Sequence, residues 1–98
     1  MLTNKQRAYL RALANPMNTI FHIGKSGITP EITEAINNAL EARELIKINV
    51  LDNNLLDTKD VAETISGRTH SEIVQVIGNR FILFRKSKTK PSIELPKK

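Results

Sequence analysis

A short turn between an apolar segment and a helix start constrains this chain more than any other feature. Residues 24–27 read Gly-Lys-Ser-Gly and follow a β-branched and aromatic segment at residues 19–23. Thr29 is a good helix N-cap, and Pro30 suits the first helical position. The sequence therefore predicts a strand, a tight turn and a helix in direct succession. A helix N-terminus and Lys25 both favour an anion, so this turn is a candidate phosphate site.

Two other interpretations of the same turn can be weighed from the sequence. Gly24-Lys25-Ser26 resembles the end of a nucleotide-binding P-loop, but that pattern requires a glycine five positions before Gly24, where this chain has Thr19. The nucleotide-hydrolase interpretation is therefore disfavoured. The turn can also be a plain strand-to-helix connection whose glycines serve geometry alone, and a Gly-x-x-Gly spacing by itself does not exclude this.

Length and composition narrow the class of protein. A chain of 98 residues is enough for one domain, and the absence of cysteine excludes disulfides and thiolate metal sites. His22 and His70 are too few and too distant in sequence to build a metal site, and no catalytic group of side chains stands out. We therefore expect a monomeric protein without enzymatic activity, cofactor, metal or small-molecule substrate. With no apolar run of ~20 residues, a cytoplasmic location and no membrane partner are expected.

Apolar periodicity predicts an element order of α-β-α-β-α-β-β. The expected helices cover residues 3–15, 30–43 and 57–66, and the expected strands cover residues 19–23, 45–50, 72–77 and 80–85. Thr3 and Gln6 have capping-box spacing, and Gly67 is expected to end the third helix. Gly78-Asn79 predicts a hairpin turn between the last two strands.

This order predicts an α/β fold, an open two-layer sandwich with a four-stranded mixed sheet and helices mainly on one side. In the strand at 45–50, Ile46, Ile48 and Val50 should face the helices, while Lys47 and Asn49 should lie on a partly open face. In the first helix the apolar face is expected to hold Leu2, Tyr9, Leu10 and Leu13. The aromatic residues Tyr9, Phe21, Phe81 and Phe84 are expected mostly in the core, which argues against stacking of bases on aromatic rings.

The charge of the chain is unevenly distributed along it. Residues 1–27 hold four basic and no acidic side chains, residues 28–79 hold four basic and nine acidic ones, and residues 80–98 hold seven basic ones and Glu94. If folding brings the two basic ends together, they form a surface that attracts polyanions. The alternative is that the basic tail merely aids solubility. From residue 86 onward lysine, serine and proline dominate, so a mobile tail is expected unless a partner orders it.

Several segments together resemble the YhbY family of bacterial RNA-binding proteins, the single-domain form of the CRM domain (chloroplast RNA splicing and ribosome maturation). The segments that carry the resemblance are residues 2–7, 10–14, 23–29, 44–48, 74–78, 81–85 and 93–98. The resemblance implies a fold related to the C-terminal domain of translation initiation factor three, no enzymatic activity, and association with precursors of the large ribosomal subunit. It divides the chain into a CRM-type RNA-binding domain at 1–86 and a basic flexible tail at 87–98.

The resulting hypothesis is an RNA-binding protein in ribosome biogenesis that binds ribosomal RNA through the 24–27 turn and a basic surface. The candidate RNA-binding residues are Gly24, Lys25, Ser26, Gly27, Arg7, Arg11, Lys47, Arg85, Lys86, Lys88 and Lys90. Phosphate and shape, rather than base sequence, would be recognised. Two alternatives stay open: an assembly factor that docks on ribosomal proteins, and a DNA-binding module.

Overall fold

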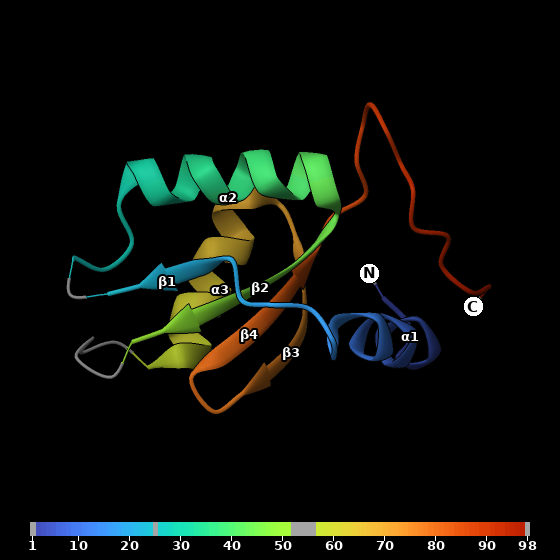
Figure 1. Cartoon of the computed structure of the whole chain (residues 1–98), viewed down its shortest axis with the longest axis horizontal. Coiled ribbons are helices and arrows are strands. Elements are labelled where there is room, and N and C mark those ends of the chain that lie inside the picture. The colour runs from blue at the N-terminus through green and yellow to red at the C-terminus, as the bar shows by residue number, and fades with distance from the viewer. Residues whose placement is uncertain (1, 25, 52–56, 98) are drawn as a thin grey trace.

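The computed structural model describes residues 2–24, 26–51 and 57–97. Within these ranges the elements follow the expected order: α1 (Asn4–Ala14), β1 (Phe21–Ile23), α2 (Pro30–Arg43), β2 (Leu45–Val50), α3 (Thr58–Thr69), β3 (Glu72–Ile77) and β4 (Arg80–Phe84) (Figure 1). The predicted α/β class and element order are therefore confirmed.

The first two helices begin where their caps predict. Thr3 Oγ1 accepts the Gln6 N–H at 3.1 Å, and Gln6 Oε1 accepts the Thr3 N–H at 3.0 Å, which completes a capping box. Thr29 Oγ1 accepts the Ile32 N–H at 3.1 Å at the start of α2. Each cap satisfies backbone donors that the helix leaves unpaired and stabilises it by about 1 kcal/mol.

The predicted end of the third helix at residue 66 is wrong. α3 continues through Gly67 to Thr69, and His70 ends it in the left-handed conformation, with φ 55° and ψ 44°. A glycine inside a helix costs only about 1 kcal/mol relative to alanine. The last turn is held because the buried Thr69 hydroxyl donates to the Ile65 carbonyl at 2.8 Å.

The strands form one mixed sheet in the order β1-β2-β4-β3. β1 pairs in parallel with β2, as the α2 crossover requires, and β4 lies antiparallel to both β2 and β3. The predicted hairpin at Gly78-Asn79 is confirmed. β1 is shorter than the predicted strand at 19–23, and β4 ends one residue before Arg85.

One face of the sheet packs against α2 and α3. Ile46, Ile48 and Val50 point to this face, as predicted, and are at most 3% exposed. Phe81 and Leu83 from β4 join them and are fully buried. Alternate residues of each strand therefore supply the main core, and helices are mainly on this side as expected.

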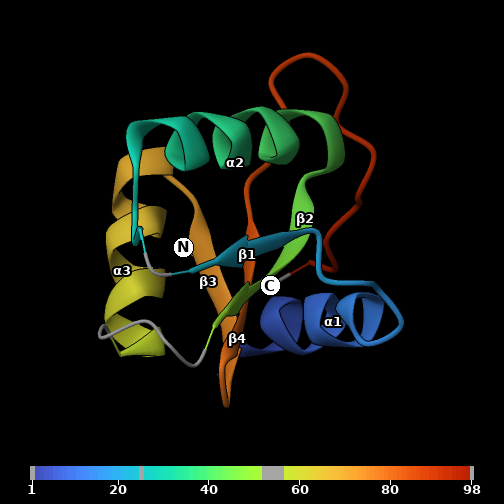
Figure 2. The ribbon, with the colours of Figure 1, turned by 60° about the vertical axis from the view of Figure 1, so that its left-hand side comes forward.

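The other face is only partly covered, by α1, which lies across the sheet from α3 (Figure 2). Leu10 and Ala14 are the fully buried residues of α1. They pack on Leu45, Val74, Ile82 and Phe84, together with Leu2, Met17, Ile93 and Leu95. Tyr9 is 41% exposed, so its expected place in the core is wrong, and Leu13, which was expected on the same apolar face, is 39% exposed. A helix that crosses a small sheet buries one narrow stripe, and Leu10 and Ala14 occupy that stripe.

Candidate nucleic-acid interface

The 24–27 turn is closed by a hydrogen bond from the Gly27 N–H to the Gly24 carbonyl at 3.0 Å. Gly27 has φ +70°, a conformation that glycine adopts without steric cost, and a Cβ there would meet nothing within 4 Å. A Cβ on Gly24 would lie 3.2 Å from the Leu51 side chain. The two glycines therefore serve different needs, backbone conformation at Gly27 and close packing at Gly24.

The turn offers a ligand fewer N–H groups than the sequence suggested. The Gly27 N–H closes the turn, and at the start of α2 Thr29 satisfies the N–H groups of Ile32 and Thr33. Ser26 is exposed at the turn, beside the positive end of the α2 dipole. Lys25, the central candidate, lies outside the described residues.

The two arginines of α1 differ in their surroundings. Arg7 donates from Nη1 to the carbonyl of Ile73 in β3, which ties α1 to the sheet. Arg11 lies one turn further on and is half-buried. Lys47, on β2, donates from Nζ to the Asn15 carbonyl at 3.4 Å, a long and exposed contact.

The side chain of Arg85 makes hydrogen bonds within the fold. Its guanidinium donates to the Thr69 carbonyl at 2.8 Å and to the side chain and carbonyl of Asn37. It also lies 3.8 Å from Glu41 Oε1, and its side chain is only 17% exposed. These contacts join α2, α3 and the end of β4, so the structure gives this side chain a role in holding the domain together.

The chain after β4 is fastened to the end of α2 by Glu41. Its carboxylate accepts the Ser87 and Thr89 hydroxyls, both at 2.8 Å, and the N–H groups of Lys88 and Thr89, both at 3.0 Å. These donors, led by the Ser87 hydroxyl, lower the pKa of Glu41 from its usual value of 4.5 to about 2. The exposed side chains of Lys86, Lys88 and Lys90 are thereby presented from a held segment.

A second carboxylate, from Glu44, holds the next part of the tail. Glu44 is 1% exposed and has φ 69°, an uncommon conformation for a residue other than glycine. Its carboxylate accepts four hydrogen bonds, from the N–H groups of Ser87, Ser92 and Ile93 and from the Ser92 hydroxyl, at 2.7–3.1 Å. Burial alone would raise the pKa of Glu44, but these donors outweigh it and the pKa lies below its usual value.

Residues 87–97 are therefore in contact with the domain, whereas a mobile tail was expected. Gln6 also donates to the Pro96 carbonyl at 3.1 Å, and Ile93 and Leu95 pack beside α1. The lysine- and serine-rich composition did not reveal the two carboxylates at the end of α2, from Glu41 and the capping residue Glu44, that accept the donors of this segment. The domain boundary after residue 86 stays a prediction.

Folding brings the two basic ends of the chain together, as the charge pattern suggested. α1 and the tail lie at one end of the molecule, and the turn between β1 and α2 lies at the other (Figures 1 and 2). The candidate residues therefore form two separate groups, with Lys47 on the sheet between them.

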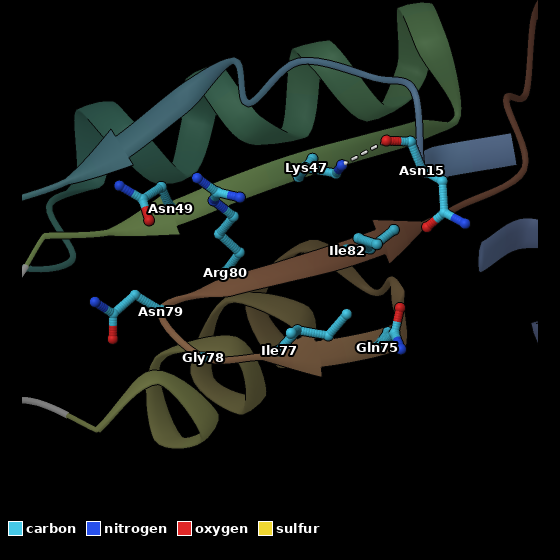
Figure 3. A pocket seen from close by; sticks show the side chains of 9 residues that line it. All are labelled: Asn15, Lys47, Asn49, Gln75, Ile77, Gly78, Asn79, Arg80 and Ile82. Carbon is cyan, nitrogen blue, oxygen red and sulfur yellow. Dashed lines mark hydrogen bonds between the residues drawn. The ribbon is translucent and has the colours of Figure 1, made fainter. Parts of the chain in front are cut away.

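The uncovered part of the α1 face holds Lys47 and Asn49, which were expected on a partly open face, together with polar residues that sequence reasoning did not select as RNA-binding. An open pocket of about 360 Å³ is lined by Asn15, Lys47, Asn49, Gln75, Ile77, Gly78, Asn79, Arg80 and Ile82 (Figure 3). Arg80 is the one exposed residue of β4, and its alternation with the buried Phe81 was the available signal that it lies on the α1 face. What the sequence could not show is that α1 stops short of this part of the sheet.

Among the described residues, no helix combines the length and apolar character needed to cross a membrane. No group of three or more histidine, cysteine, aspartate or glutamate side chains in those ranges is placed to hold a metal ion.

Comparisons with known proteins agree on one family. Residues 2–85 match the model of the CRS1 / YhbY (CRM) domain. The chain is 46% identical over 96 residues to the "Probable RNA-binding protein YqeI" of Bacillus subtilis, covering 98% of this chain and 100% of that protein. It is 33% identical over 97 residues to an "RNA-binding protein" of Haemophilus influenzae, covering 99% and 97% of the two chains.

A solved structure shows the same fold. The solution structure of the hypothetical protein SAV1595 from Staphylococcus aureus, a candidate RNA-binding protein, matches with a TM-score of 0.81 and 52% identity, covering 98% of this chain and 100% of that one. The chain belongs to the CRS1 / YhbY (CRM) domain family.

Proposed function

We propose that this protein binds RNA without catalysing a reaction, and that it acts in the cytoplasm on ribosomal RNA in precursors of the large ribosomal subunit. Membership of a family whose relatives are named as RNA-binding proteins carries the proposal. The segregation of basic side chains at the ends of the chain, which folding brings side by side, is the physical support.

Two groups of residues would contact the RNA backbone. The first is the 24–27 turn, where the open space around Gly27 lets a phosphate approach and Lys25 supplies charge. The second is the basic end, formed by Arg11 with Lys86, Lys88 and Lys90. The internal hydrogen bonds of Arg7 and Arg85 make direct RNA contacts by these side chains secondary.

The separation of these groups suggests how RNA is recognised. The molecule extends 39 Å along its longest axis, and a folded RNA that holds its phosphates at a matching separation can contact both groups without the entropy loss that a flexible strand would incur. We therefore expect a preference for folded RNA over a flexible single strand of the same length.

Crosslinking in growing cells, followed by sequencing of the attached RNA, tests this function. The expected result is enrichment of large-subunit ribosomal RNA, strongest in precursor particles. Crosslinks spread evenly over messenger and transfer RNA would contradict it. Competition between duplex DNA and folded RNA tests the DNA-binding alternative, and retention by purified ribosomal proteins without RNA affinity would favour the assembly-factor alternative.

A further inference from the structure

The α1 face of the sheet carries two rows of side chains that run across the strands. The register places the first row on His22, Asn49, Arg80 and Ile77. It places the second row on Lys47, Ile82 and Gln75. Neighbouring side chains within a row have their Cβ atoms about 5 Å apart, and the two rows lie two residues, or about 7 Å, apart along each strand, so one small ligand can contact both rows.

The charged side chains that line the pocket between these rows are all basic. Lys47 and Arg80 are its charged lining residues, and none of the described residues that line it carries a carboxylate. Four carboxamide side chains surround them, from Asn15, Asn49, Gln75 and Asn79 (Figure 3). Ile77, which is 57% exposed, supplies apolar surface, whereas Ile82 is only 4% exposed. A carboxamide donates and accepts hydrogen bonds at once, which suits the edge of a nucleobase, whereas the cations suit a phosphate.

Two polar contacts made by side chains of the pocket are long. Lys47 Nζ lies 3.4 Å from the Asn15 carbonyl, and Asn49 Nδ2 lies 3.4 Å from His22 Nδ1. Both distances are at the long end for hydrogen bonds, so a ligand can replace these contacts at little cost. The volume of about 360 Å³ lies at the lower end of the range of small-ligand sites.

We propose that this pocket holds one unpaired RNA nucleotide. Asn49 and Gln75 bind the edge of the base, Lys47 and Arg80 bind its flanking phosphates, and Ile77 supports the base plane. This inference rests on the proposed RNA-binding function and adds base recognition to a surface otherwise expected to recognise phosphate and shape. The positive charge of the lining residues selects a nucleic acid over a cationic or neutral partner.

The test is a nuclear magnetic resonance titration of the full chain with the tetraribonucleotides AAAA, CCCC, GGGG and UUUU. The side-chain NH₂ signals of Asn49 and Gln75 report directly on the pocket. At least one tetranucleotide is expected to shift both signals. The double variant Asn49→Ala, Gln75→Ala should raise the Kd for that tetranucleotide about tenfold, because two hydrogen bonds to the base are removed.

Two further variants keep the result interpretable. Asn38→Ala, at an exposed position on α2, should leave the Kd unchanged. Lys47→Gln with Arg80→Gln should weaken binding of all four tetranucleotides and flatten the salt dependence.

Equal Kd values for the wild type and the Asn49→Ala, Gln75→Ala variant would overturn the proposal. So would shifts confined to the 24–27 turn, or no tetranucleotide binding by a protein that binds folded ribosomal RNA. In these cases the proposed function survives. Both the nucleotide pocket and the proposed RNA-binding function would be contradicted only if the protein also failed to bind the folded RNA.

Discussion

The two faces of the sheet are made by alternate residues of the same strands, but one face is buried and the other is partly open. On the face under α2 and α3, Ile46, Ile48 and Phe81 are completely buried. On the α1 face, their neighbours Lys47, Asn49 and Arg80 border an open pocket. One face therefore supplies the packing that holds the fold, and the other leaves polar groups available to a ligand.

The sharpest test of this difference compares two adjacent residues of β4. Phe81→Ala should lower the free energy of unfolding by about 3–5 kcal/mol, because it removes a fully buried ring and leaves a cavity. Arg80→Ala, next to it on the exposed face, should change that free energy by less than about 0.5 kcal/mol. Urea unfolding followed by circular dichroism measures both, and similar losses in the two variants would contradict the division of the sheet.

The next largest effect is expected where the tail joins α2. Glu44→Gln should cost about 2 kcal/mol, because an amide NH₂ would face N–H donors that the carboxylate now accepts. Urea unfolding gives the free energy, and loss of the amide protection of Ser92 and Ile93 would show release of the tail. Glu34→Gln, at an exposed position on α2, is the control and should be close to neutral. Equal behaviour of the two variants would contradict the role of Glu44.

Acid should release the same segment. The folded-state pKa of Glu41 is lowered to about 2, so the stabilisation by this carboxylate is complete above its usual value of 4.5 and disappears as pH falls through about 2. The lowered pKa of Glu44 acts in the same direction. The N–H signals of Lys88 and Thr89 should therefore titrate with a midpoint near pH 2, and this transition should vanish in Glu41→Gln. A midpoint near 4.5 would show that the hydrogen bonds to Glu41 are not formed.

The smallest expected effect distinguishes exposed lysine side chains from Arg85, whose side chain is hydrogen-bonded within the fold. Lys88→Gln with Lys90→Gln should reduce the slope of log affinity for RNA against log salt by about 0.7–0.9 for each phosphate that is no longer neutralised. Arg85→Gln should destabilise the fold but leave that slope unchanged, since its guanidinium is bound to Thr69 and Asn37. The slope is read from binding curves at several salt concentrations. A reduced slope for Arg85→Gln would show that this side chain contacts RNA.

Local signals in the sequence predicted most of the fold. The Thr3 and Thr29 caps, the alternation along β2 and the Gly78-Asn79 turn each act over a few residues, and all are found as expected. The failures involve contacts between distant segments. Nothing near Tyr9 shows that α1 buries only a narrow stripe, and nothing near residue 87 shows that Glu41 and Glu44 will hold the tail.

As with the fold, only the local features of the candidate site could be predicted from the sequence. The 24–27 turn and the basic ends could be found from residue types and spacing, because glycines, caps and charge runs are visible in the sequence. The hydrogen bonds that Arg85 makes within the fold and the exposure of Arg80 depend on where α1, α2 and α3 lie on the sheet. Such features follow from tertiary packing and need a structure.

The central claim, that the 24–27 turn contacts RNA, is tested most directly by Gly27→Asp. The φ of +70° strains any residue with a side chain, but aspartate is one of the few that adopt it, and the added side chain enters open space, so the fold should survive while a negative charge is placed at the turn. The measurement is the Kd of the folded variant for the ribosomal RNA fragment recovered by crosslinking, beside the wild type at the same salt concentration. We predict that the variant binds at least tenfold more weakly. An unchanged Kd in a folded Gly27→Asp protein would contradict the claim.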